Sequence, residues 1–171
     1  NIVDTIGAAG EVDTYTFDAT VGEAIVLGIG EVGVDSAFVP WIRLQRPDTT
    51  VIGSQSGTLA AQIEVLAPAT GTYTVLVSSG DVGQNDTGTY TLTLAKAPGA
   101  FTISGGDEGG AMTNGSSHLG NTHIGDLDMW SFQAVAGEAL TVGIGETGPN
   151  SAFVPWIRLR SPTGQNLGSQ S

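Results

Sequence analysis

Two pairs of carboxylates with the same spacing are the residues of this sequence best suited to hold a cation. Glu11 and Asp13 stand just before an apolar run, and Asp126 and Asp128 repeat the arrangement 115 positions later. Calcium takes oxygen ligands, which carboxylates, amides and backbone carbonyls supply. The pairs therefore predict a calcium site. The alternative is that each pair caps a turn and faces water.

A tryptophan and an arginine recur with the same offset. Trp41 and Arg43 reappear as Trp156 and Arg158 within SAFVPWIRL, a stretch that the chain spells twice. Because side chains alternate between the two faces of a strand, we expect both to point away from the core. There they have the chemistry to stack on a sugar ring or anchor a protein contact. The alternative is a structural role, in which a strand, a loop or a neighbouring repeat covers the indole.

The sequence offers little for catalysis. A hydrolytic triad needs a base beside a nucleophile, and the only histidines are His118 and His123, which face Val3 and Ala8 in the complete first copy. The repeated GIGE at Gly28–Glu31 and Gly143–Glu146 lacks the third glycine and following helix of a phosphate-binding fingerprint. Close packing of a strand explains it better. We therefore expect no enzymatic activity and no catalytic residue.

The repetition extends well beyond these motifs. Gly22–Ser56 aligns without a gap with Gly137–Ser171, and 22 of the 35 pairs are identical. A repeat of this length indicates whole domains in tandem. We expect a complete domain over residues 1–98, a linker rich in Gly, Ser and Asn over 99–115, and the first half of a second copy over 116–171.

Period-2 alternation of apolar residues predicts strands throughout the chain. Tyr15 and Phe17 share one face of a strand, and turn-forming segments rich in glycine separate such runs. The sequence therefore predicts an all-β fold, an antiparallel β-sandwich of jelly-roll type repeated in tandem. The apolar face of one run recurs in the second copy; the two sets are Ile25, Leu27 and Ile29, then Leu140, Val142 and Ile144.

Charge and composition narrow the range of partners. Asp and Glu outnumber Lys and Arg 17 to 5, and a net charge of −12 repels nucleic-acid phosphates. The chain has no cysteine, which excludes disulfides and thiolate metal sites. No stretch approaches the roughly 20 apolar residues of a membrane helix. We expect a secreted or cell-surface protein with neither nucleic acid nor a membrane span among its partners.

A series of strand motifs in the first copy has a characteristic order. A D-x-Y-x-F strand at Asp13–Phe17 is followed by Pro47-Asp48, by TGTYTVLV at Thr70–Val77 and by GTYTLTL at Gly88–Leu94. This order resembles the bacterial pre-peptidase C-terminal domain, related in fold to the collagen-binding domains of clostridial collagenases. The resemblance spans about residues 1–98, and 116–171 as a first half. It implies a non-catalytic β-sandwich on secreted or surface proteins, some members binding calcium and some binding polymers.

The resemblance also implies where calcium binds. In calcium-binding relatives, carboxylates comparable to the repeated pairs act together with acidic residues of the preceding linker. Here that linker supplies Asp107, Glu108 and Asn114. The candidate ligands are therefore Glu11, Asp13, Asp107, Glu108, Asn114, Asp126 and Asp128.

Two functions of different classes fit these observations. The first is a structural or adhesive module of a tandem-repeat surface or filament-forming protein, with adjacent repeats or copies of itself as partners. It is motivated by the half copy, since half a sandwich exposes strand edges and an apolar face. The second is an accessory module of a secreted hydrolase that binds carbohydrate or protein through Trp41 and Arg43. We favour the structural function.

Overall fold

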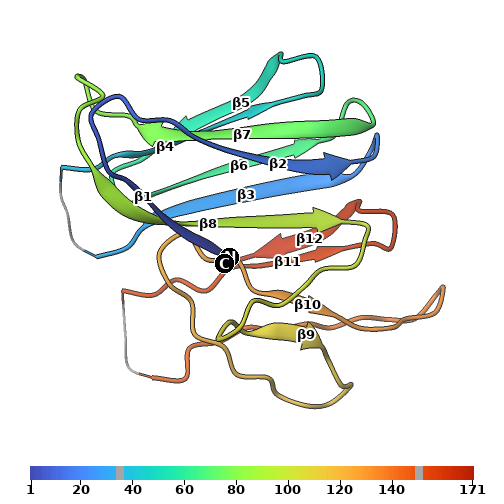
Figure 1. Cartoon of the computed structure of the whole chain (residues 1–171). Coiled ribbons are helices and arrows are strands. Elements are labelled where there is room, and N and C mark those ends of the chain that lie inside the picture. Colours follow the sequence, from blue (N-terminus) through green and yellow to red (C-terminus); the bar gives the residue numbers. More distant parts are fainter. Residues whose placement is uncertain (34–36, 149–151) are drawn as a thin grey trace.

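The computed structural model describes residues 1–33, 37–148 and 152–171, and these contain strands but no helix (Figure 1). Eight strands form two four-stranded antiparallel sheets, in the orders β1-β8-β3-β6 and β2-β7-β4-β5. The strands are β1 (Ile2–Ile6), β2 (Asp13–Ala19), β3 (Ala24–Glu31), β4 (Pro40–Gln45), β5 (Val51–Ser56), β6 (Ala60–Leu66), β7 (Gly71–Ser79) and β8 (Gly88–Ala97). The predicted all-β sandwich is confirmed. The described residues include no helix long and apolar enough to cross a membrane.

The core lies between these two sheets and follows the predicted alternation. In β4, Ile42 and Leu44 are buried while the intervening residues are partly exposed. Ile25, Leu27 and Ile29 of β3 belong to the same buried cluster. Apolar side chains on one face of each strand therefore meet between the layers, where removal of their surface from water is the main stabilising contribution.

The outer face of β3 is buried as well, which is unusual for a sandwich exposed to water on both sides. Every residue of β3 is buried, including Gly28 and Gly30, whose missing side chains would point outward. The backbone of residues 124–125 lies against these two glycines. The start of the second copy therefore covers part of the first sandwich.

The second copy forms only short strands. β10 (Met129–Ser131) pairs in parallel with β9 (Gly109–Ala111), and β11 (Ile157–Arg160) pairs with β12 (Asn166–Gln170). The β11–β12 hairpin has the same register as the β4–β5 hairpin, with the same irregularity after Leu159 as after Leu44. This hairpin is thus built alike in both copies, because both of its strands are present in each copy (Figure 1).

The counterpart of β3 differs from the prediction. Residues 139–146 form no strand, and Leu140 and Ile144 are 40% and 49% exposed. In the first copy, β3 is paired on both sides, by β6 and by β8. Residues 139–146 pair with none of the described strands. The segment therefore lacks the backbone partners and the apolar layer that hold β3.

Candidate functional site

The second carboxylate pair is brought close to the linker. Single oxygens of Asp107, Asp126 and Asp128 lie within 4.8 Å of one another. The structure thus groups three of the seven candidate ligands. Two turns position them: the amide of Asp107 donates to the carbonyl of Ser104, and that of Asp126 to the carbonyl of His123, each at 3.1 Å. Among the described residues, this is the only group of three or more His, Asp or Glu side chains close enough to share a metal ion.

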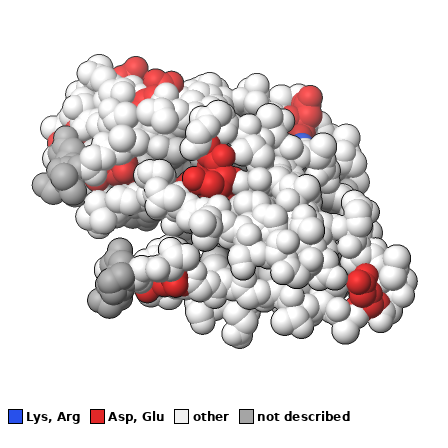
Figure 2. Space-filling view, turned by 90° about the horizontal axis from the view of Figure 1, so that it is seen from below, with Lys and Arg blue, Asp and Glu red and all other residues white. Residues whose placement is uncertain are grey.

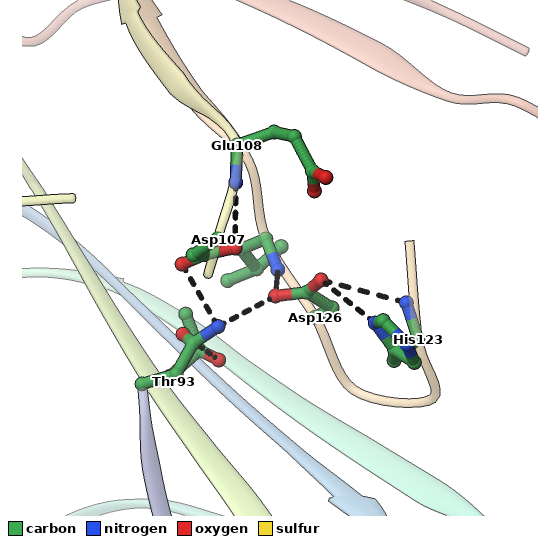
Figure 3. Close-up of polar contacts among 7 residues, drawn as sticks. Thr93, Asp107, Glu108, His123 and Asp126 are labelled. Carbon is green, nitrogen blue, oxygen red and sulfur yellow. Dashed lines mark hydrogen bonds and ion pairs between the residues drawn. The ribbon is translucent and has the colours of Figure 1, made fainter. Parts of the chain in front are cut away.

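A side-chain amide bridges two of these carboxylates. Asn1 Nδ2 donates to Asp107 Oδ2 at 2.9 Å and to Asp126 Oδ1 at 3.0 Å. Thr93 Oγ1 in turn donates to Asn1 Oδ1 at 2.7 Å (Figure 3). The two carboxylates therefore converge on a single donor, which is the arrangement that a bound cation also requires.

Asp128 is electrostatically the most strained member of this cluster. Partial burial, together with the negative charges of Asp126, Asp107 and Glu108, raises its pKa to about 6. Its Oδ1 is buried and has no hydrogen-bond partner among the described residues. A cation that bound here would neutralise the repulsion between the carboxylates and would supply the contact that Asp128 Oδ1 lacks.

The remaining predicted ligands lie around or away from this cluster. Glu108 contributes negative charge next to Asp128. Asn114 is exposed in a turn closed by a hydrogen bond between Ser116 and Thr113. Glu11 and Asp13 lie in the first copy, where the protein itself satisfies them.

The first pair has structural partners. Glu11 Oε2 accepts hydrogen bonds from the amides of Gly7 and Ala8, at 2.6 and 2.9 Å, and so caps the turn. Asp13 Oδ2 accepts a hydrogen bond of 2.6 Å from the hydroxyl of Tyr90. For Glu11 the geometry matches the turn-capping alternative. Asp128 Oδ1, by contrast, has no hydrogen-bond partner among the described residues.

The tryptophan and arginine of each copy form a stacked pair. The Arg43 guanidinium lies 4.3 Å from the centre of the Trp41 ring, and Arg158 lies 4.3 Å from Trp156. Trp41 Nε1 also donates to Ser54 Oγ at 2.9 Å. Stacking of this kind holds an arginine in one orientation while leaving its other face available.

In the second copy this surface contacts the first sandwich. Arg158 and Arg160 both form ion pairs with Glu64 on β6, the latter at 2.6 Å. Trp156 stays 42% exposed. The pair predicted as a ligand site therefore serves, in one of its two occurrences, as a contact between repeats.

A contact between glycines was not predicted from the sequence. A Cβ atom on Gly28 would lie 2.6 Å from the carbonyl oxygen of Gly125, and one on Gly30 would overlap the backbone of Ile124. The repeated GIGE motif indicated close packing of a strand but not its partner. The feature of the sequence that could have indicated this contact is the recurrence of glycine at Gly10 and Gly125.

The two histidines have contacts within the second segment. His118 lies 5.1 Å from Trp130, ring centre to ring centre, and accepts a hydrogen bond of 3.1 Å from the amide of Thr113. His123 is exposed and lies 3.9 Å from Asp126. On the face seen in Figure 2, acidic side chains form separate groups and basic ones are nearly absent.

Comparisons with known proteins agree with the sequence motifs. Residues 11–79 match the family model of the bacterial pre-peptidase C-terminal domain, which confirms the resemblance over this range. No curated protein matches the chain.

Three solved structures show partial similarity. The periplasmic inhibitor of g-type lysozyme, PliG, from Aeromonas hydrophila is 18% identical over 56% of this chain and 82% of its own, with a TM-score of 0.44. The pre-peptidase C-terminal domain of a collagenase from Bacillus anthracis is 20% identical over 55% and 86%, also with a TM-score of 0.44. A glycosylation-associated protein complex from Streptococcus agalactiae is 17% identical over 61% and 40%, with a TM-score of 0.32.

Proposed function

Because residues 11–79 match the bacterial pre-peptidase C-terminal domain, we propose that the chain is a non-catalytic structural or adhesive module. In this proposal the module is secreted or displayed at the cell surface, and its repeats associate with one another or with further copies. Pre-peptidase C-terminal domains are accessory domains without catalytic activity, which supports the first part. Contacts between the two copies support the second.

The observation that carries the proposal is the packing of the second copy on the first. Glu64 of β6 pairs with Arg158 and Arg160, while the turn at Gly125 covers Gly28 and Gly30. These contacts combine charge complementarity with close backbone approach. The ion pairs depend on opposite charges and the backbone contact depends on glycine. An interface between copies needs these residue types, whereas an isolated sandwich does not need them.

Exposed apolar residues of the second copy favour association as well. Phe153, Val154 and Leu167 are 38%, 69% and 55% exposed, in addition to Leu140 and Ile144. Apolar surface that stays in water favours contact with another protein surface. The high net negative charge of the chain disfavours nonspecific association between copies, because like charges repel.

Calcium is part of this proposal as a ligand of the joint between the copies. Asp107 belongs to the linker and Asp126 and Asp128 to the second copy, so an ion held by all three would fix the linker against that copy. The side-chain amide of Asn1, in the first copy, donates to both Asp107 and Asp126, so the first copy also contacts this site.

Sedimentation velocity of the intact chain over a wide range of concentration tests the proposal. We expect the weight-average sedimentation coefficient to rise with concentration, because the second copy exposes unpartnered surface. A coefficient that stays at the monomer value throughout would contradict the proposal. The measurement is made in chelator and again in calcium.

A second candidate function rests on the stacked pair in the first copy. There the stacked side chains of Trp41 and Arg43 are both only partly buried. Such a pair suits a sugar ring or a protein side chain, as in an accessory module of a secreted hydrolase. Pull-down on insoluble polysaccharides and on collagen, for the parent chain and for Trp41→Ala, separates the two functions. Binding that is lost in a folded variant supports the second; absence of binding by the parent chain contradicts it.

A further inference from the structure

One asparagine of the linker lies in a turn that is closed by its own backbone. The amide of Ser116 donates to the carbonyl of Thr113 at 3.1 Å, so Asn114 and Gly115 are the two central residues of a β-turn. Gly115 has a φ of +77°, whereas Asn114 has no positive φ. This combination is typical of a type II turn, which takes glycine at its third position. The hydrogen bond that closes the turn joins residues 113 and 116 and involves neither sheet of the sandwich.

The two groups that can react with each other in this turn are both free. Asn114 and Gly115 are exposed, and neither the side-chain amide of Asn114 nor the backbone amide of Gly115 forms a hydrogen bond with the described residues. Apart from its two neighbours in the chain, none of the described atoms lies within 4 Å of a Cβ built on Gly115. Glycine itself has no side chain to hinder an approaching group. The side-chain carbonyl carbon of Asn114 and the nitrogen of Gly115 are therefore accessible to each other.

We propose that Asn114 is a site of spontaneous deamidation, at which a succinimide forms and then opens to aspartate and isoaspartate. The backbone nitrogen of Gly115 loses its proton and attacks Cγ of Asn114, which the chain holds close to it. A bond forms between this nitrogen and Cγ, and the bond from Cγ to the side-chain nitrogen breaks. The leaving nitrogen takes up the proton and departs as ammonia. Water then adds to one of the two carbonyl carbons of the ring and breaks the bond from that carbon to the ring nitrogen.

Both products change the linker covalently. Opening at Cγ restores the normal backbone with an aspartate at position 114, whereas opening at the main-chain carbonyl gives isoaspartate, in which the backbone runs through Cβ and Cγ. Each product adds one negative charge to a chain whose net charge is −12. Isoaspartate also lengthens the backbone of the turn by one carbon atom, between β9 and the second copy. This chemistry does not depend on the proposed association of copies.

Three other described asparagines are held by hydrogen bonds. Asn1 Nδ2 donates to two carboxylates, and Asn166 Oδ1 accepts a hydrogen bond of 3.1 Å from a backbone amide. Asn85 is followed by Asp86, whose backbone amide donates to Asp81 Oδ1 at 3.4 Å. In each of these cases the structure restrains either the side-chain amide or the nitrogen that would have to attack it.

Asn121 provides a matched control within the same chain. It is exposed and forms no hydrogen bond with the described residues, as is true of Asn114. It is followed by Thr122, however, and a β-branched side chain restricts the backbone and crowds the attacking nitrogen. Asn114 is the only asparagine of the sequence that is followed by glycine. The two positions therefore differ mainly in the residue that supplies the attacking nitrogen.

Incubation of the intact chain in mildly alkaline buffer, followed by digestion and tandem mass spectrometry, tests this site. We expect Asn114 to be converted several times faster than Asn121, into two products of equal mass that chromatography separates. The rate should rise with pH, because the attacking nitrogen must lose its proton. Equal conversion at the two asparagines, or retention of the amide at Asn114, would overturn the inference.

The variant Asn114→Gln gives a second test. Glutamine keeps the side-chain amide, but attack by the next backbone nitrogen would have to close a larger and less favourable ring. Because position 114 is exposed, we expect the fold to be unaffected. An enzyme that methylates isoaspartate should label the aged parent chain but not the aged variant. Equal labelling of the two proteins would place the isoaspartate at another residue and overturn the assignment to Asn114.

Discussion

The hydroxyl of Tyr90 donates a hydrogen bond of 2.6 Å to the carboxylate of Asp13, 77 positions earlier in the chain. This contact joins β8 to β2 and so links the two sheets at one end of the sandwich. Oδ1 of Asp128, the counterpart of Asp13, has no hydrogen-bond partner among the described residues, and this side chain lies among other carboxylates. The same residue is therefore a structural acceptor in one copy and a candidate metal ligand in the other.

Replacement of Tyr90 by phenylalanine should destabilise the first sandwich. The change leaves Asp13 without its donor and also removes a contact of 2.6 Å with the hydroxyl of Tyr15. We expect a loss of about 1–3 kcal/mol in the free energy of unfolding, measured by urea titration, because a charged acceptor loses its partner. Tyr73→Phe is the control; it removes a bond to the carbonyl of Ala69 and should cost about 1 kcal/mol. Equal losses would show that the carboxylate contact contributes nothing special.

Replacement of Glu31 by methionine should stabilise the protein. Glu31 is 2% exposed, and neither carboxylate oxygen has a hydrogen-bond partner among the described residues. Removal of an unsatisfied buried polar group typically gains about 1–3 kcal/mol. The urea midpoint should rise for this variant and stay unchanged for Glu146→Met, because Glu146 is exposed. A lower midpoint for Glu31→Met would mean that the carboxylate has a partner that the described residues do not show.

The turn between β4 and β5 should give an acid-dependent contribution to stability. A hydrogen bond from Arg46 lowers the pKa of Asp48 from 3.8 to about 2. A folded-state pKa below the unfolded value stabilises the protein above pH 3.8, and this contribution is lost as the pH falls through about 2. The difference in stability between the parent chain and Asp48→Asn should therefore shrink between these pH values, and it should be smaller in high salt. A difference that grows on acidification would reverse the assigned sign.

Calcium should bind at the linker if the carboxylate cluster is a metal site. The double variant Asp126→Asn, Asp128→Asn removes two of the three clustered carboxylates and should abolish the heat of calcium binding in a calorimetric titration. Glu146→Gln, which removes an exposed carboxylate of the same copy, should bind as the parent chain does. Absence of heat in the parent chain, or equal binding in all three proteins, would contradict this site.

Alternation within a strand made most of the first sandwich predictable. The inward residues of β3 and β4 and the outward pair Trp41 and Arg43 follow from period 2 and need no knowledge of distant contacts. The β11–β12 hairpin was predictable from the β4–β5 sequence, because its two strands carry their own partners. Local pattern suffices where the pairing is local.

Contacts between distant segments were not predictable in the same way. Residues 139–146 resemble β3 closely, yet they form no strand because β3 depends on pairing with β6 and β8. The contact of Gly125 with Gly28 and Gly30 depends on where the linker leads the chain. The clustering of Asp107 with Asp126 and Asp128 has the same origin. The residue types were found from the sequence, and their grouping required the fold.

The measurement that tests the proposed association most directly is the mass of the intact chain, determined by light scattering over a wide range of concentration. We predict that the weight-average mass rises with concentration above the value of one chain, because apolar side chains of the second copy stay exposed. A mass that stays at the value of a single chain at every concentration would contradict the association.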